Sequence, residues 1–356
     1  MMTMRLGWLL PLVAMAGLTA CRQDVPLPVV SAPLDASSRE SRPRPSEEED
    51  AAVADSGQPA AESDAGSCNG GVRQVSFRQF HAQVILAVDR SASMGDKPAG
   101  ASSSRWQMVQ NVLRSLMRTY HQAVYFGYVE FPALECRHGV CCSGGFIPPS
   151  PSHGAIERKW TCGQTTCPAR SADSPAGFAL YESRHHFETA EQSSGSRHVF
   201  LITDGEPSCG EGPNMAACDQ ATKEVAELVG QDIRTTIFAM DPALKTSTCL
   251  SDLTAIGSGG QLYTSADETA LRDQLEAILS PLATESCSFR LREALLPPER
   301  LALRINGTSL LRDPSRKEGW EFDADDDMSH FTVYGSWCAK LRESEVYDID
   351  AYVCSR

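Results

Sequence analysis

The sequence predicts an α/β protein with a doubly wound, mostly parallel sheet and helices on both of its faces, followed by a small C-terminal β-rich disulfide module. Three observations predict it. Apolar segments of strand length alternate with amphipathic segments of helix length across residues 80–283, an order typical of a parallel sheet. Two of the apolar segments end in an aspartate and small residues. Beyond residue 284, tight-turn residues and shorter alternating segments replace this pattern.

The first 21 residues have the features of a signal peptide. Arg5 precedes an apolar run, residues 6–18, that is too short to cross a membrane comfortably. Residues 18–21 resemble the lipobox of bacterial lipoproteins, which implies cleavage before Cys21 and lipidation of its thiol. Because Arg22 is not the aspartate associated with inner-membrane retention, we expect a lipid anchor in the outer membrane. The alternative is an ordinary secretory signal with a chance cysteine.

Residues 22–79 are predicted to form a disordered tether. They are rich in Pro, Ser, Ala, Asp and Glu and almost lack aromatic residues, so they bury too little apolar surface to fold. The acidic run at 47–50 contributes to the net charge of −14. That charge argues against nucleic acid as a partner, because neutralising phosphates requires clustered Lys and Arg.

Strands and helices are expected to alternate through residues 80–283. Strands are predicted at 82–88, 123–131, 197–203, 233–240 and 261–263. Helices are predicted at 104–120, 176–187, 215–229, 247–256 and 267–282. The first helix is recognised by apolar residues at helical spacing on one face, namely Trp106, Val109, Val112, Leu113, Leu116, Met117 and Tyr120.

The cysteine count indicates an oxidising compartment. The chain has 13 cysteines, and an even number remains when Cys21 is set aside, which favours disulfides. Zinc is the alternative for close pairs such as Cys162 and Cys167, although no pair has the spacing of a zinc ribbon. A Cys-rich insertion is expected at 135–170. Its role is left open between a stapled surface loop and a determinant of partner specificity.

The C-terminal module, residues 284–356, is expected to be built from short strands. Alternation at 301–305 followed by Asn306-Gly307 predicts a strand and a tight turn, and further strands are expected at 331–334 and 346–353. Disulfides among Cys287, Cys338 and Cys354 are expected to pin it. Three cysteines cannot all pair with one another, so at least one reaches elsewhere or stays free.

Polar residues follow two of the predicted strands directly. Asp89, Ser91 and Ser93 come after the apolar run 84–88, and Asp204 comes after strand 197–203. Ligands of open α/β sheets bind at the carboxyl ends of the strands. Small oxygen ligands converging at one point suit Mg²⁺, or Ca²⁺ at longer distances.

The motif Asp89-x-Ser91-x-Ser93, within this alternating order, resembles the von Willebrand factor A (VWFA) domain. In that family it is the first part of the metal-ion-dependent adhesion site (MIDAS). Ser174, in Ser-Pro-Ala-Gly, stands where a second loop normally supplies a threonine, and Asp204 lies in the Thr-Asp-Gly turn of the third loop. The resemblance covers roughly residues 80–282. The chain departs from the family pattern at Ala92, where glycine is common, and at Ser174 itself.

This resemblance implies a site for a divalent cation, Mg²⁺ first, with Ca²⁺ or Mn²⁺ as alternatives. Ser91, Ser93 and Ser174 would supply hydroxyl oxygens, Asp89 would hold them by hydrogen bonds or through water, and Asp204 would act directly or through water. The family uses such a cation to bind an acidic side chain of a protein partner. We therefore expect a cell-envelope lipoprotein that acts in adhesion or assembly and is not an enzyme.

Other interpretations remain beside this one. Asp and Ser also occur after strands simply as helix caps. A structural envelope scaffold with a vestigial metal site is the main alternative function. An exported hydrolase is another, although no Gly-x-Ser-x-Gly elbow occurs in the required context. Glu206 is expected to be a solvated charge, and His185-His186 a surface pair.

Overall fold

The computed structural model describes residues 72–133, 141–160, 173–190, 195–210, 216–293, 295, 300–324, 328–343 and 347–354. The predicted signal peptide, Cys21, most of the tether, and Cys136, Cys162 and Cys167 of the insertion lie outside the described residues. Within the described ranges, every helix is too short or too polar to cross a membrane.

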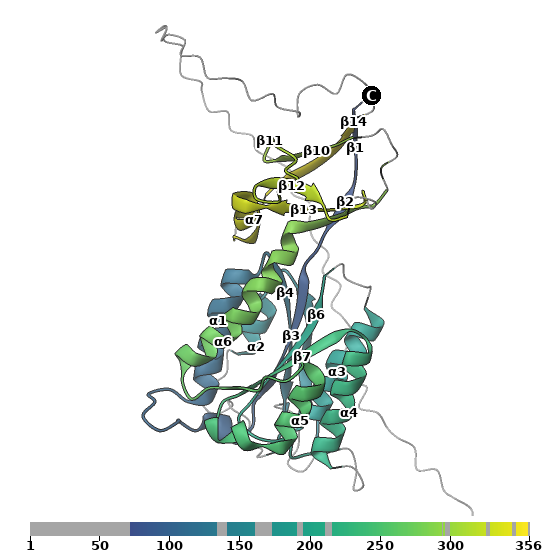
Figure 1. The fold of residues 1–356 in the computed structure, drawn as a ribbon. Helices are drawn as coiled ribbons and strands as arrows, with labels where there is room; N and C mark the ends of the chain where they lie inside the picture. The colour runs from purple at the N-terminus through teal and green to yellow at the C-terminus, as the bar shows by residue number, and fades with distance from the viewer. Residues whose placement is uncertain are drawn as a thin grey trace, which may run out of the picture. The chain divides into compact units, whose positions relative to one another are not determined.

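A six-stranded sheet forms the centre of the α/β region, in the order β5-β4-β3-β6-β7-β8 (Figure 1). The mostly parallel sheet predicted from the sequence is confirmed, since only β5 runs antiparallel to its neighbour. The strands are β3 (Ala82–Asp89), β4 (Val124–Phe131), β5 (Gly144–Ser150), β6 (Arg197–Thr203), β7 (Ile233–Ala239) and β8 (Tyr263–Thr264).

The helices of this region contribute to two separate apolar clusters. Side chains of α1 (Arg105–Tyr120) and α6 (Glu268–Leu282) belong to the first cluster. Side chains of α3 (Ala176–Thr189), α4 (Ala217–Gly230) and α5 (Thr248–Gly257) belong to the second. Figure 1 shows α1 and α6 together on one side of the sheet and α3, α4 and α5 on the other.

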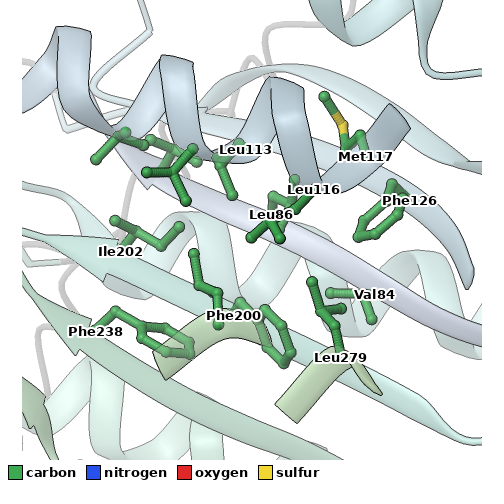
Figure 2. Close-up of a cluster of buried hydrophobic side chains, with 14 of the residues drawn as sticks. Val84, Leu86, Leu113, Leu116, Met117, Phe126, Phe200, Ile202, Phe238 and Leu279 are labelled. Carbon is green, nitrogen blue, oxygen red and sulfur yellow. The ribbon is translucent and has the colours of Figure 1, made fainter. Parts of the chain in front are cut away.

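The strand β3 explains this division. Successive side chains of a strand point to opposite faces. Val84 and Leu86 accordingly pack in the first cluster, against Leu113 and Leu279 among others (Figure 2), whereas Ile85 lies in the second. A parallel strand covered on both faces therefore needs a continuous apolar run, which is what the sequence supplies.

Local signals fix where the helices begin. The Ser104 side chain accepts from the backbone of Gln107, and Gln107 in turn caps Ser104, which forms a capping box at the start of α1. Asp267 and Ser247 accept hydrogen bonds at the starts of α6 and α5 in the same way. The predicted helices agree with the observed ones to within about two residues at each end.

The described residues of the insertion expected at 135–170 include β5 and the short helix α2 (Gly154–Lys159). Pro148 and Pro149 lie in β5, and proline is tolerated there because β5 is an edge strand. Gly127 of β4 leaves room for this strand, since a Cβ at that position would lie 2.8 Å from Cδ of Pro149.

The β-rich module consists of two four-stranded antiparallel sheets around a third apolar cluster. One sheet has the order β1-β14-β10-β11, with β1 (Val72–Gln74), β14 (Ile349–Cys354), β10 (Arg300–Ile305) and β11 (Thr308–Leu310). The other has the order β12-β13-β9-β2, with β12 (Gly319–Phe322), β13 (His330–Tyr334), β9 (Ser288–Leu291) and β2 (Phe77–Gln79). The helix α7 (Gly335–Arg342) follows β13.

The module corrects two predicted boundaries. Residues 72–79, which are predicted to belong to the tether, instead contain β1 and β2, which pair with β14 and β9. The module is therefore not confined to residues 284–356, and the α/β region is inserted between its second and third strands. Local sequence does not reveal such short strands, because their stability comes from pairing with residues more than 200 positions away.

Three disulfides lie among the described residues, which confirms the prediction of disulfide bonds. Cys141 pairs with Cys209, Cys218 with Cys249, and Cys287 with Cys338. The last of these joins the end of the short helix η3 (Ala283–Cys287) to α7, inside the predicted C-terminal group. The turn at Asn306-Gly307 is also observed, with φ values of 50° and 75° between β10 and β11.

Candidate metal site

Four of the five predicted site residues lie at the carboxyl ends of β3 and β6, the two central strands of the sheet, and the fifth, Ser174, lies just before α3. Asp89 is the last residue of β3, and the short helix η1 (Ala92–Gly95) follows it. Thr203 is the last residue of β6, and Asp204 follows it. From β3 the chain leads to β4 on one side, and from β6 to β7 on the other, so the strand order reverses here. Such reversal points open a crevice in α/β sheets.

Asp89 is the centre of the hydrogen bonds in this region, and it is fully buried. Its Oδ1 accepts a hydrogen bond from the backbone N of Ser91 at 2.8 Å. Its Oδ2 accepts from Oγ of Ser174 at 2.9 Å and from Oγ1 of Thr203 at 2.7 Å. One carboxylate thereby joins three segments that are far apart in the sequence.

The remaining oxygens form a connected row beside Asp89. Oγ of Ser91 lies 3.0 Å from Oγ of Ser93, and Oγ of Ser93 donates to Oδ1 of Asp204 at 2.9 Å. Ser91 is buried, whereas Ser93 is exposed, so the row opens to solvent at Ser93. All five predicted site residues are thus brought together.

The donor set fits a small hard cation. Mg²⁺ holds six oxygens at about 2.0–2.1 Å, so neighbouring ligand oxygens are about 3 Å apart. The separations from Ser91 to Ser93 and from Ser93 to Asp204 match that spacing. The same two separations are hydrogen-bond lengths. The oxygens that now bond to one another would therefore need to move little to surround a cation. The described residues contain no cluster of three or more His, Cys, Asp or Glu suited to a metal, and hydroxyls predominate at this site.

Electrostatics at the site also favours a positive charge. Burial, and then the neighbouring charge of Asp204, raise the pKa of Asp89 to about 6 despite hydrogen bonds from Ser91 and Thr203. Burial likewise raises the pKa of Asp204. Two carboxylates that each resist ionisation are stabilised in their charged forms by a cation between them.

Two hydroxyl residues support the site although the sequence analysis did not assign them a role. Thr203 also accepts from the backbone N of Gly205 at 3.2 Å, which shapes the turn that carries Asp204. Ser208 holds the segment of Ser174 from both sides: its Oγ accepts from N of Ser174 at 2.7 Å, and its N donates to O of Ser174 at 3.1 Å. Thr203 was recognisable as part of the Thr-Asp-Gly turn, but nothing in the sequence indicates Ser208.

Arg105 is a third residue that the sequence analysis missed. Its Nη1 lies 3.7 Å from Oδ2 of Asp204 and 3.4 Å from O of Ser93. It reaches the site from the first turn of α1. The sequence does not indicate this contact, because an arginine in the first turn of a helix is common and does not by itself point to a site.

Two further sets of polar side chains make their hydrogen bonds apart from this row of oxygens. Glu206 is exposed and accepts a hydrogen bond from Ser247. In a separate cluster, Ser196 contacts both Nε2 of His198 and the carboxylate of Glu285. A hydrolytic triad instead places its carboxylate on the histidine, so this cluster has a different order from a triad.

Comparisons with known proteins give distant structural likenesses. No family model and no curated protein sequence matches the chain. The PilB minor pilin from Streptococcus sanguinis is 12% identical, with a TM-score of 0.45 over 58% of this chain and 62% of the pilin. The pilus adhesin SpaC from Lactobacillus rhamnosus GG is 11% identical, with a TM-score of 0.46 over 77% of this chain and 39% of the adhesin.

The VWA domain of SpRpn10 is 10% identical, with a TM-score of 0.39 over 57% of this chain and 96% of that domain. The chain thus spans less than two thirds of the length of either pilus protein. At these identities and TM-scores, none of the likenesses assigns a function to this chain.

Proposed function

We propose that this chain binds a divalent cation at the carboxyl ends of β3 and β6 and, through that cation, an acidic group of a protein partner. The observation that carries the proposal is the connected row of oxygens from Ser91 through Ser93 to Asp204, with Asp89 and Ser174 joined behind it. The order of the six strands supports a doubly wound sheet, and the motif resembles the MIDAS of VWFA domains.

The roles of the residues follow from their contacts. Ser91 and Ser93 present hydroxyl oxygens to the cation, and Ser174 offers a third hydroxyl within reach of Asp89. Asp89 is buried and already accepts three hydrogen bonds, so it orients these groups and supplies charge from behind. Asp204 supplies the second negative charge.

This donor set suits recognition of an acidic partner. Most of the oxygens are neutral hydroxyls, so the cation retains positive charge after binding to the protein. Cations of this kind prefer oxygen ligands, and a carboxylate from another protein satisfies that preference. Mg²⁺ is the proposed cation, with Mn²⁺ and Ca²⁺ as alternatives. The resulting activity is binding, in adhesion or assembly, and not catalysis.

The lipobox-like Cys21 supports a location in the cell envelope, anchored in the outer membrane by lipid. Multiple acyl chains hold a protein firmly, since each buried CH₂ contributes about 0.8 kcal/mol. On this proposal, residues 22–71 lie in the sequence between the anchor and the first residues that the structure describes.

Calorimetric titration with Mg²⁺ and Mn²⁺ tests the cation site. We expect the wild type to bind, Ser93→Ala to bind at least tenfold more weakly, and Asp89→Asn to bind more weakly still. Ser93 is exposed, so its replacement leaves the fold intact, which thermal unfolding verifies. Ser196→Ala serves as the matched control, because Ser196 is an exposed serine outside the site. Equal responses from the wild type and Ser93→Ala would contradict the site.

The same titration separates adhesion from the alternative of a structural scaffold with a vestigial site. A scaffold requires no cation, so a wild type that binds neither Mg²⁺ nor Mn²⁺ in the millimolar range would favour that alternative. Binding at micromolar concentrations favours the adhesion proposal.

A further inference from the structure

Arg105 places a fixed positive charge beside Asp204 of the candidate site. Its guanidinium touches two other segments: Nη1 faces Asp204, whereas Nε donates to O of Met240 at 3.1 Å and Nη2 contacts Oδ2 of the neighbouring Asp241 at 3.3 Å. The side chain is only 15% exposed, so these contacts hold it in one place with little solvent around it.

The two oxygens of Asp204 face different partners. Oδ1 accepts the hydrogen bond from Ser93, and Oδ2 lies on the side of Arg105. The guanidinium therefore orients the Asp204 carboxylate, with one oxygen toward the serine hydroxyls, and offsets part of its negative charge.

We propose that Arg105 is a specificity-determining residue of this site: its charge weakens the binding of the cation and strengthens the binding of the partner's carboxylate. The inference rests on the proposed function, since it concerns the same site. A positive charge behind Asp204 repels a divalent cation and attracts an anion that approaches the cation from solvent. The two affinities therefore change in opposite directions when the charge is removed.

The other charges near Arg105 do not cancel this effect. The side chain of Asp241 is 37% exposed, so solvent weakens its effect on the site more than that of Asp204, whose side chain is 1% exposed. Asp96 also acts on Asp204 and adds negative charge at the rim. An acidic rim makes the positive charge of Arg105 more important for accepting an acidic partner.

The test compares Arg105→Gln with Arg105→Lys, which keeps the charge. Calorimetry measures Mn²⁺ affinity, and ¹⁹F NMR relaxation measures the binding of fluoroacetate, a simple carboxylate probe, to the Mn²⁺-loaded protein. For Arg105→Gln we expect about tenfold tighter Mn²⁺ binding and several-fold weaker fluoroacetate binding. Arg105→Lys is expected to resemble the wild type in both.

The outcomes separate this inference from the function on which it rests. If both affinities fall in Arg105→Gln, the residue only maintains the structure, and the inference is overturned. Unchanged affinities overturn it as well, while the cation site itself stands. If the wild type and both variants fail to bind Mn²⁺, the proposed function fails and takes the inference with it.

Discussion

Asp89 shows how a single buried residue organises the candidate site. Its two oxygens accept one backbone and two hydroxyl hydrogen bonds, from Ser91, Ser174 and Thr203. The sequence allowed Asp89, Ser91, Ser93 and Asp204 to be predicted, because they stand at or just beyond the end of a buried strand. It did not allow Arg105 or Ser208 to be predicted, because their contacts to the site depend on how separate loops meet.

A second buried charge lies beside Asp89. Nη1 of Arg90 pairs with Oε1 of Glu130 at 2.9 Å, and both side chains are nearly inaccessible. Arg90→Met leaves Glu130 buried without its main partner and is expected to lower the free energy of unfolding by about 3–5 kcal/mol. Adding Glu130→Leu to Arg90→Met is expected to restore most of the lost stability. Denaturant unfolding measures both, and a double variant no more stable than Arg90→Met would contradict the expectation.

His198 makes stability depend on pH. Burial, with a smaller effect of Arg234, lowers its pKa from 6.5 to about 4. Between these values the unfolded chain binds more protons than the folded one, so the contribution to stability is lost as pH falls through this window. Between pH 7 and pH 4, the free energy of unfolding of the wild type is expected to fall by roughly 3 kcal/mol more than that of His198→Gln.

Urea unfolding at several pH values, without added cation, checks this prediction. Asp89 has the opposite effect, because its raised pKa favours the folded state at low pH, but that effect is common to both proteins. The quantity to follow with pH is therefore the difference in the free energy of unfolding between the wild type and His198→Gln. A difference that stays constant from pH 7 to pH 4 would show that His198 is not buried in its neutral form.

At the scale of the elements, loops far apart in sequence are joined near the site. The disulfide between Cys141 and Cys209 connects the predicted insertion to the segment that carries Ser208, and Ser208 holds Ser174. Apolar periodicity predicted the parallel strands and the five helices that pack on them, but it did not predict β5 or α2, which lie in the insertion. The pairing of these cysteines did not, because spacing alone leaves many connectivities open.

This disulfide is expected to matter for cation binding. The double variant Cys141→Ser/Cys209→Ser frees the segment of Ser208 and is expected to weaken Mg²⁺ binding about tenfold, since ordering the loop then accompanies binding. Cys218→Ser/Cys249→Ser is the matched control, because that disulfide joins α4 to α5. The control is expected to lose about 2–4 kcal/mol of stability and no cation affinity. Calorimetry at a temperature where both variants are folded distinguishes them, and equal affinities would refute the role of the loop.

At the scale of the whole molecule, the α/β region is inserted into the β-rich module between β2 and β9. Val75 is buried in the cluster of that module, and Phe77 lies edge-on against Phe289 at 5.6 Å. The fold class was predictable because long apolar strands and helices carry their own signal. The inserted arrangement was not, because β1 and β2 are three residues each.

Removing these strands is expected to weaken the module alone. A chain beginning at residue 80 no longer buries Val75 and Phe77, and this is expected to lower the stability of the module by roughly 2–4 kcal/mol. A chain beginning at residue 70 retains both and serves as the control. Hydrogen exchange is expected to show faster exchange in β9 and β14 of the shorter chain, with β3 and β6 unchanged. Equal protection of β9 and β14 in both chains would contradict the pairing.

The most direct test of the cation site is a crystal structure of the folded region, residues 70–356, grown with Mn²⁺ and measured for anomalous scattering. The account predicts one anomalous peak bonded to Oγ of Ser91 and Oγ of Ser93, near Asp204, which disappears in Ser93→Ala. A Mn²⁺-saturated crystal with no peak at these oxygens, or with an unchanged peak in the variant, would contradict it.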